Sequence, residues 1–307
     1  MSKVLAIGET VFDIIFRHRQ PVAARPGGSM LNSAVSLGRA GIPVQMITEL
    51  GDDETGRLVL DFLKENGVAT SYIKPVAGFK TTVSLAFLDE KGNANYSFYK
   101  NYPNDRLNIH WPEVTKGDVI LFGSYYSLMP GIRQKVFEFI KKAKQNGALV
   151  FYDPNIRKNH LHELNSLMPF IMENIALADI IRGSDEDFLN LFGLKNDDAI
   201  FDLVKNSGCN NLIVSKGENG ADLLSGDIRS HAPADKIDIA STIGAGDSFN
   251  AGIIFGLLKN GFSVDDLVDI TPEKWNELLN FGINFAADVC RGYDNYISEE
   301  IILKLNG

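Results

Sequence analysis

The run Ser241-Thr242-Ile243-Gly244-Ala245-Gly246-Asp247-Ser248-Phe249 places small residues and one carboxylate in a tight turn that opens a helix. Apolar side chains recur downstream at three- and four-residue spacing, so we expect the helix to begin near Gly246 and to run to about Lys259. Gly261 then ends it. A helix N-terminus presents unpaired backbone N–H groups, and glycine lets an anion approach the main chain closely. The stretch therefore predicts an anion-binding turn at the start of a helix.

In one interpretation of this turn, Gly244, Ala245 and Gly246 form an anion hole. Asp247 is then a carboxylate placed to accept a proton from a substrate hydroxyl as phosphate arrives. In a second interpretation, Asp247 only caps a helix after a glycine turn. Short glycine-rich turns are common, so the stretch alone leaves both interpretations open.

Composition narrows the class of protein. The chain has 307 residues, enough for one large α/β domain or two modest ones. Its net charge of -9 disfavours nonspecific binding to nucleic acid or to an anionic membrane. The two cysteines, Cys209 and Cys290, lie far apart, which suits a reducing compartment and no disulfide. We find no run typical of a signal peptide or a membrane span, and we expect a cytoplasmic protein.

Short apolar strands alternate with amphipathic helices along most of the chain. This alternation predicts an α/β fold with a mostly parallel, doubly wound sheet covered by helices on both faces, within a single domain spanning residues 1–307. We expect strands at Val4–Ile7, Val44–Leu50, Val119–Phe122, Ala148–Tyr152, Asp179–Ile181 and Asn211–Ser215, and helices at Ser29–Arg39, Ile132–Gln145 and Glu163–Asn174.

The pattern changes between Thr81 and Tyr99. Two extended runs, Thr82–Leu88 and Asn95–Tyr99, flank the turn Asp89–Asn93, which predicts a hairpin. We expect a small sheet standing away from the main one, drawn from about residues 10–26 and 78–104, and we call it the lid sheet.

Polar residues follow several of the expected strands or open the expected helices. Each alone has an ordinary explanation as a surface charge, a turn former or a solvated helix residue. Their shared position at one edge of the sheet favours a common site instead. They are Asp13, Gly27, Gly28, Asn32, Asn155, Arg157, Ser215, Lys216 and Gly217.

Four stretches, in this order, carry a resemblance to a known family. They are Pro26–Ala34 followed by Leu37–Gly41, Gly51–Gly56, Tyr152–Arg157, and Ile243–Phe249 with Ala251-Gly252. With them the chain resembles the ribokinase-like, or PfkB, carbohydrate kinase family from end to end. The resemblance implies a ribokinase-like fold and ATP-dependent phosphorylation of a hydroxymethyl group on a sugar.

The resemblance also implies roles for particular residues. Asp247 is similar to the catalytic base, and Gly244 to Gly246 resemble the anion hole. The implied sugar contacts are Asp13, Gly27, Gly28 and Asn32, and Arg157 is similar to an arginine that faces sugar or phosphate. Phe98 or Tyr99 is expected to pack on the sugar, although an aromatic at strand spacing is more often part of the core. The implied nucleotide contacts are Ser184, Ser215, Lys216, Gly217 and Asn284. Mg²⁺ is implied with ATP because the phosphate charge has to be neutralised.

Three departures from the family pattern concern cations, and one of them is the tail Arg291–Asn295, which replaces a common small-residue loop. Ser241 stands where relatives carry an aspartate that helps to hold a monovalent cation, so activation by K⁺ is not carried over. The family's Asn-x-x-Glu element appears as Ser184-Asp185-Glu186-Asp187. The metal would therefore have to use Asp187 or Glu186, through water if not directly.

Fructose is the leading substrate, because the hairpin and Ser184 look more like fructokinase-type members than like nucleoside kinases. Ribose, 2-keto-3-deoxygluconate and a nucleoside remain alternatives, and the lid sheet of some members clasps a partner, which allows a homodimer. A catalytically silent sugar-binding protein is an alternative of another class, and the intact loop with Asp247 counts against it. A nicotinamide-dependent dehydrogenase is disfavoured because Gly8-Glu9-Thr10 follows the first strand in place of Gly-x-Gly-x-x-Gly.

Overall fold

The computed structural model describes residues 2–89, 94–102 and 106–306. The strands are β1 (Val4–Ile7), β2 (Val11–Arg17), β3 (Gln20–Gly27), β4 (Val44–Gly51), β5 (Val68–Val76), β6 (Lys80–Leu88), β7 (Ala94–Asn101), β8 (Val119–Gly123), β9 (Leu149–Asp153), β10 (Ile180–Ser184), β11 (Asn211–Ser215), β12 (Ala221–Ser225) and β13 (Ile228–Ala232). The helices are α1 (Ser29–Arg39), α2 (Glu54–Glu65), α3 (Pro130–Gln145), α4 (Leu164–Leu177), α5 (Asp185–Phe192), α6 (Asp197–Asn206), α7 (Ala245–Lys259), α8 (Pro272–Cys290) and α9 (Glu299–Asn306).

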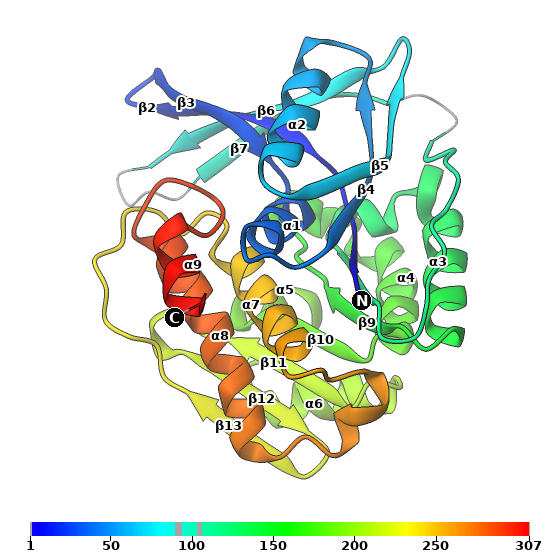
Figure 1. Ribbon diagram of the computed structural model, residues 1–307, viewed down its shortest axis with the longest axis vertical. Helices are drawn as coiled ribbons and strands as arrows, with labels where there is room; N and C mark the ends of the chain where they lie inside the picture. Colours follow the sequence, from blue (N-terminus) through cyan, green and yellow to red (C-terminus); the bar gives the residue numbers. More distant parts are fainter. Residues whose placement is uncertain (1, 90–93, 103–105, 307) are drawn as a thin grey trace.

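The main sheet has the strand order β13-β12-β11-β10-β9-β8-β1-β4-β5. Its pairs from β11 to β5 are parallel, and β12 and β13 add an antiparallel edge. Alternate residues of each strand enter two separate cores. On β1, for example, Val4 and Ala6 pack with α1 and α7, whereas Leu5 and Ile7 pack with α3 and α4. Helices thus cover both faces, as Figure 1 shows, and the predicted doubly wound α/β fold is confirmed.

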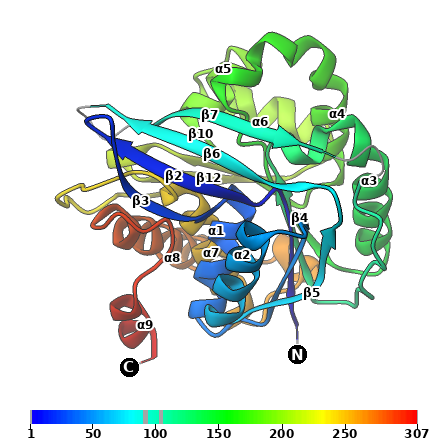
Figure 2. The same cartoon turned by 90° about the horizontal axis from the view of Figure 1, so that it is seen from above.

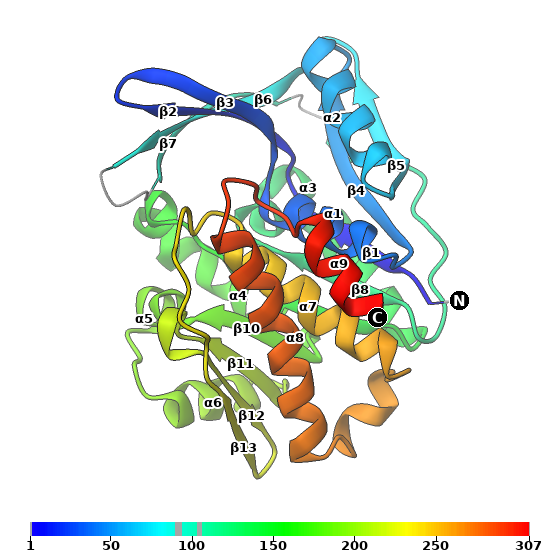
Figure 3. The ribbon, with the colours of Figure 1, turned by 60° about the vertical axis from the view of Figure 1, so that its left-hand side comes forward.

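The lid sheet has the order β3-β2-β6-β7. Strand β2 pairs antiparallel with β3 and parallel with β6, and β6 pairs antiparallel with β7, as expected for the hairpin. Residues 90–93 of the predicted hairpin turn lie outside the described residues. Figure 2 shows the four strands side by side, and Figure 3 shows them at the top of the molecule, above α5, α7 and α8.

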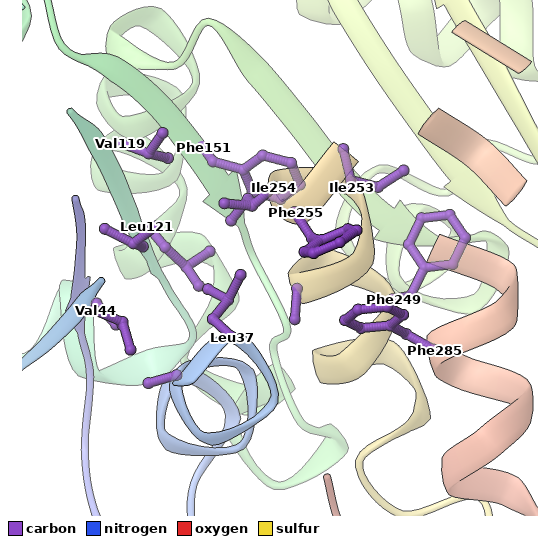
Figure 4. Close-up of a cluster of buried hydrophobic side chains, with 14 of the residues drawn as sticks. Leu37, Val44, Val119, Leu121, Phe151, Phe249, Ile253, Ile254, Phe255 and Phe285 are labelled. Carbon is purple, nitrogen blue, oxygen red and sulfur yellow. The ribbon is translucent and has the colours of Figure 1, made fainter. Parts of the chain in front are cut away.

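Helix α7 is largely enclosed by the rest of the molecule. Its residues Asp247–Leu257 are all buried, because the helix is apolar around most of its circumference and packs between the main sheet, α1 and α8. Figure 4 shows Phe249, Ile253 and Phe255 of α7 within a cluster of buried hydrophobic side chains, with Phe285 of α8 beside them. The buried helix fixes where its first turn, which carries Asp247, stands relative to the sheet. Its bounds agree with the predicted start near Gly246 and end at Lys259.

Candidate active site

Asp247 lies in the first turn of α7 and is 5% exposed. Gly244 is the N-cap residue and no side chain caps the helix, so the interpretation of Asp247 as a helix cap does not hold. Oδ2 of Asp247 instead accepts a hydrogen bond of 2.8 Å from Nδ2 of Asn32 on α1. Ser33, also on α1, donates to the Asp247 backbone carbonyl at 2.8 Å. Helix α1 therefore holds both the backbone and the carboxylate of Asp247 in place.

Burial raises the pKa of Asp247 above the ordinary value for an aspartate. The hydrogen bond from Asn32 and the positive charges of Arg157 and Arg182 act in the opposite direction, and Asp187 adds to the rise. A raised pKa makes the carboxylate a better proton acceptor than an exposed aspartate.

The turn before Asp247 depends on glycine. Gly244 has a φ of +81°, a left-handed conformation that residues with a side chain rarely adopt. A Cβ there would also lie 2.7 Å from the Cα of Asn295. The chain before α7 thus packs directly against the loop that follows α8, and the turn from Gly244 to Gly246 presents its backbone at the helix N-terminus.

Two cavities meet at Asp247. One has a volume of about 100 Å³ and lies under the lid sheet, and the other has a volume of about 1340 Å³ and lies over the carboxyl ends of β10 and β11. Both are lined by Tyr96, Phe98, Asn155, Arg157, Ile243 and Asp247. A group bound in one cavity would therefore face a group bound in the other across the Asp247 carboxylate.

The smaller cavity contains most of the predicted sugar residues. Asp13, Gly28 and Asn32 line it together with Phe98 and Arg157. Gly27 does not line it, but packs against the Asp13 carboxylate so closely that a Cβ would overlap it.

The register of the lid sheet explains how three of these side chains come together. Asp13 on β2 pairs with Ser84 on β6, and Ser84 pairs with Phe98 on β7, so the three side chains stand in one row on one face. Ser84 donates a hydrogen bond to the Asp13 carboxylate. Burial raises the pKa of Asp13 to about 6, although Ser84 and the charges of Arg157 and Arg25 oppose the rise.

The larger cavity contains part of the predicted nucleotide set. Ser184, Ser215 and Gly217 line it, as do Gly244, Ala245 and Gly246.

Lys216 and Asn284 are not among the residues that line either described cavity. The Lys216 ammonium is held by Asp197 at 2.7 Å and by Asp222 at 2.5 Å. Asn284 is exposed on α8, whose neighbouring residues Ile283, Ala286 and Ala287 form the cavity wall instead.

The predicted metal residues Glu186 and Asp187 both line the larger cavity. Asp187 closes the capping box of α5, where its Oδ2 accepts from the Ser184 backbone at 2.8 Å and from the Ser184 hydroxyl at 2.6 Å. Glu186 pairs with Lys158 at 2.7 Å on the surface. Within the described ranges no group of three or more histidine, cysteine or acidic residues could hold a metal ion. The donors present fit an ion held mainly by phosphate oxygens and water, as Mg²⁺ usually is at phosphate sites.

Sequence reasoning missed a polar cluster at the far wall of the smaller cavity. Glu9, which follows β1, accepts from Lys100 at 2.9 Å and from the Tyr102 hydroxyl. Beside them Tyr125 stacks on His160, with ring centroids 3.6 Å apart. Glu9 and Tyr102 are 93 positions apart, so no local pattern signals the contact.

A buried carboxylate beside a glycine turn, placed where two cavities meet at the carboxyl edge of a doubly wound sheet, is the arrangement of a kinase that phosphorylates an alcohol. The pfkB family carbohydrate kinase pattern matches residues 1–300. The chain belongs to this family.

The chain is also similar to individual carbohydrate kinases in sequence and in structure. The chain is 31% identical over 262 residues to a fructokinase of Rhizobium leguminosarum bv. trifolii, which covers 83% of this chain and 79% of the relative. It is 27% identical to an aminoimidazole riboside kinase of Salmonella typhimurium, over 84% of this chain and 82% of the relative. Among solved structures, a fructokinase from Vibrio cholerae O395 in its fructose, ADP and calcium ion bound form superimposes with a TM-score of 0.87, at 20% identity, over 99% and 98% of the two chains. This last likeness shows the fold.

No helix in the described part of the chain is long and apolar enough to cross a lipid bilayer.

Proposed function

We propose that this carbohydrate kinase transfers the γ-phosphoryl group of ATP to a hydroxymethyl group of a small sugar, with fructose as the first candidate. The observation that carries the proposal is the buried Asp247 carboxylate, set between the two cavities and beside the turn Gly244–Gly246. The smaller cavity has the polar lining that a sugar site needs, and the larger one has room for a nucleotide.

In this proposal Asp247 accepts the proton of the hydroxymethyl group as its oxygen attacks phosphorus. The backbone of the turn donates to the transferring phosphoryl group, where negative charge collects. Asp13, Asn32 and Arg157 hold the sugar by hydrogen bonds, and Phe98 covers it. Ser184, Ser215 and Gly217 lie against the nucleotide, whereas Lys216 and Asn284 have no part in it.

Mg²⁺ is the proposed divalent ion, held by phosphate oxygens and water with Asp187 and Glu186 as the proposed protein carboxylates. When bound it neutralises phosphate charge. Ser241 supplies no carboxylate, so we propose activity that does not depend on K⁺. The free and buried cysteines Cys209 and Cys290 suit the proposed cytoplasmic location.

Fructose is supported by the fructokinase relative, and a nucleoside-like acceptor is the second candidate because an aminoimidazole riboside kinase is also similar. The candidate acceptors are separated by kcat/KM for ADP release with Mg-ATP. The panel contains fructose, ribose, 2-keto-3-deoxygluconate, adenosine and aminoimidazole riboside. We expect the largest value for fructose. Binding of a sugar without turnover would support the silent sugar-binding alternative and overturn the proposal.

We also propose that residues 1–307 act as one unit and that the outer face of the lid sheet pairs with a second copy. On that face Phe16 stacks on Phe87, with centroids 5.0 Å apart, and Tyr99 is 63% exposed. Light scattering of Tyr99→Lys should show a loss of dimer relative to wild type, whereas Val268→Lys, at an 84% exposed position outside the lid sheet, should leave it intact. A monomeric wild type would contradict the pairing.

A further inference from the structure

Arg182, on β10, joins three neighbouring strands to the start of α7. Its Nη1 donates to Oδ2 of Asp153 on β9 at 3.1 Å, and its Nη2 donates to Oγ of Ser215 on β11 at 2.6 Å. Oδ2 of Asp153 also accepts from Nδ2 of Asn250 on α7 at 2.6 Å. The guanidinium and the helix are therefore tied to one carboxylate.

This network is buried, since Arg182 is 6% exposed and Asp153 and Asn250 are fully enclosed. An arginine whose two terminal nitrogens are bonded on neighbouring strands is held in one orientation. Its position is thus set by the main sheet and not by solvent.

The guanidinium lies directly beneath the glycine turn. A Cβ on Gly246 would stand 2.9 Å from Nη1 and 3.1 Å from Nη2 of Arg182. Any side chain at this position would collide with a group that cannot move away. Arg182 also lines the larger cavity, on the side where the turn faces it.

We propose that Arg182 is a positioning residue for phosphoryl transfer, which supports the turn Gly244–Gly246 from below and keeps positive charge next to the transferring phosphoryl group. This inference rests on the proposed function, since it assigns Arg182 to the same site. A fixed positive charge stabilises the negative charge that develops in the transition state without having to reorganise.

The same charge acts on Asp247. The charged and titratable groups that face this carboxylate are Arg157, Arg182, Asp153, Asp187 and Tyr96. Arg182 opposes the burial that raises the pKa of Asp247, so its removal raises that pKa further. The acid limb of the kcat profile then moves to higher pH.

The test compares Arg182→Met and Arg182→Lys with Arg133→Met. Arg133 is a suitable control because its side chain is 7% exposed, it pairs with Glu173 at 2.6 Å, and it lines neither described cavity. We expect Arg182→Met to lower kcat by about 10²-fold and to leave the sugar KM within about threefold. Arg182→Lys keeps the positive charge but loses the planar guanidinium, so its kcat should lie between those of Arg182→Met and wild type. Arg133→Met should lose stability and keep kcat.

A binding measurement gives a second readout. Aluminium fluoride with Mg-ADP mimics the transferring phosphoryl group, so wild type should bind ADP more tightly when it is present. Arg182→Met should lose this gain, and Arg133→Met should keep it. If Arg182→Met does not fold, Asp153→Asn/Arg182→Met removes both buried charges and takes its place.

A kcat within about threefold of wild type in either Arg182→Met variant, or an equal loss in Arg133→Met, would overturn the inference. If wild type phosphorylates no sugar of the panel, the proposed substrate class fails. The gain in ADP affinity with aluminium fluoride still tests the role of Arg182 in that case. A gain seen in wild type and absent in Arg182→Met supports the inference. An equal gain in both, or none in wild type, overturns it.

Discussion

The substitution Gly244→Ala tests whether the turn before Asp247 is shaped for its task. Gly244 combines a φ of +81° with close packing against the main chain of Asn295. Alanine would carry its Cβ to 2.7 Å from the Asn295 Cα, and 2.8 Å from its carbonyl carbon. Both neighbours are backbone atoms, so neither can rotate away.

The magnitude follows from these two effects. The left-handed conformation costs an alanine about 1 kcal/mol, and the clash adds about 1 to 2 kcal/mol of overpacking. Relief of the clash requires the turn to shift by about 1 Å to reach ordinary contact distance. A displacement of about 1 Å at a reacting centre costs about 10²-fold in rate. We therefore expect Gly244→Ala to lose about 2 to 3 kcal/mol of folding free energy and about 10²-fold in kcat.

Gly261→Ala is the matched control at the other end of the same helix. Its φ is +71°, and no atom lies within 4 Å of the position that an alanine Cβ would take. It should lose about 1 kcal/mol in urea unfolding and keep wild-type kcat in the coupled ADP-release assay. If the two variants have equal kcat, the turn does not place the phosphoryl group and the reasoning fails.

Two further outcomes are expected. Burial raises the pKa of Asp13 to about 6 from 3.8, so its folded form binds a proton more readily than the unfolded chain does, and its contribution to stability is lost as pH rises from about 4 to about 6. The urea unfolding midpoint of wild type should fall over this pH range, and that of Asp13→Asn should not. The wild-type sugar KM should rise as pH drops below about 6. An Asp13→Asn midpoint that falls with pH as wild type does would contradict the assignment. Lys216→Met should leave the KM for ATP within about twofold of wild type, because Asp197 and Asp222 occupy its ammonium, and a tenfold rise would show that Lys216 reaches the nucleotide.

The parts of the site that could be predicted from sequence are those with a local signal. Helical spacing and Gly261 predicted the bounds of α7, and the small residues before Asp247 predicted the tight turn at its start. Likewise, the hairpin of β6 and β7 was predictable because strand alternation and turn residues are local patterns. These features follow from short-range rules of backbone conformation.

The rest depends on contacts between distant segments. Lys216 was predicted to contact the nucleotide because it stands in the turn after β11. Its ion pairs with Asp197 on α6 and Asp222 on β12 were not predictable, because local patterns do not bring these segments together. The cavity wall on α8 is set by the rotation of that helix, which turns Ala286 inward and Asn284 outward. Arg182 acquires its place only from the register of β9, β10 and β11.

The central claim, that Asp247 is the base of a sugar kinase, is tested most directly by kcat of Asp247→Asn with Mg-ATP and the best sugar. Asp118→Asn serves as the control. Asp118 is also buried, at 1% exposed, but its carboxylate accepts hydrogen bonds from the backbone N–H groups of Lys3 and Thr115, which are not part of the site. We predict a loss of about 10³-fold or more for Asp247→Asn, with sugar binding retained, and wild-type kcat for folded Asp118→Asn. An Asp247→Asn enzyme that turns over within about tenfold of wild type would contradict the account.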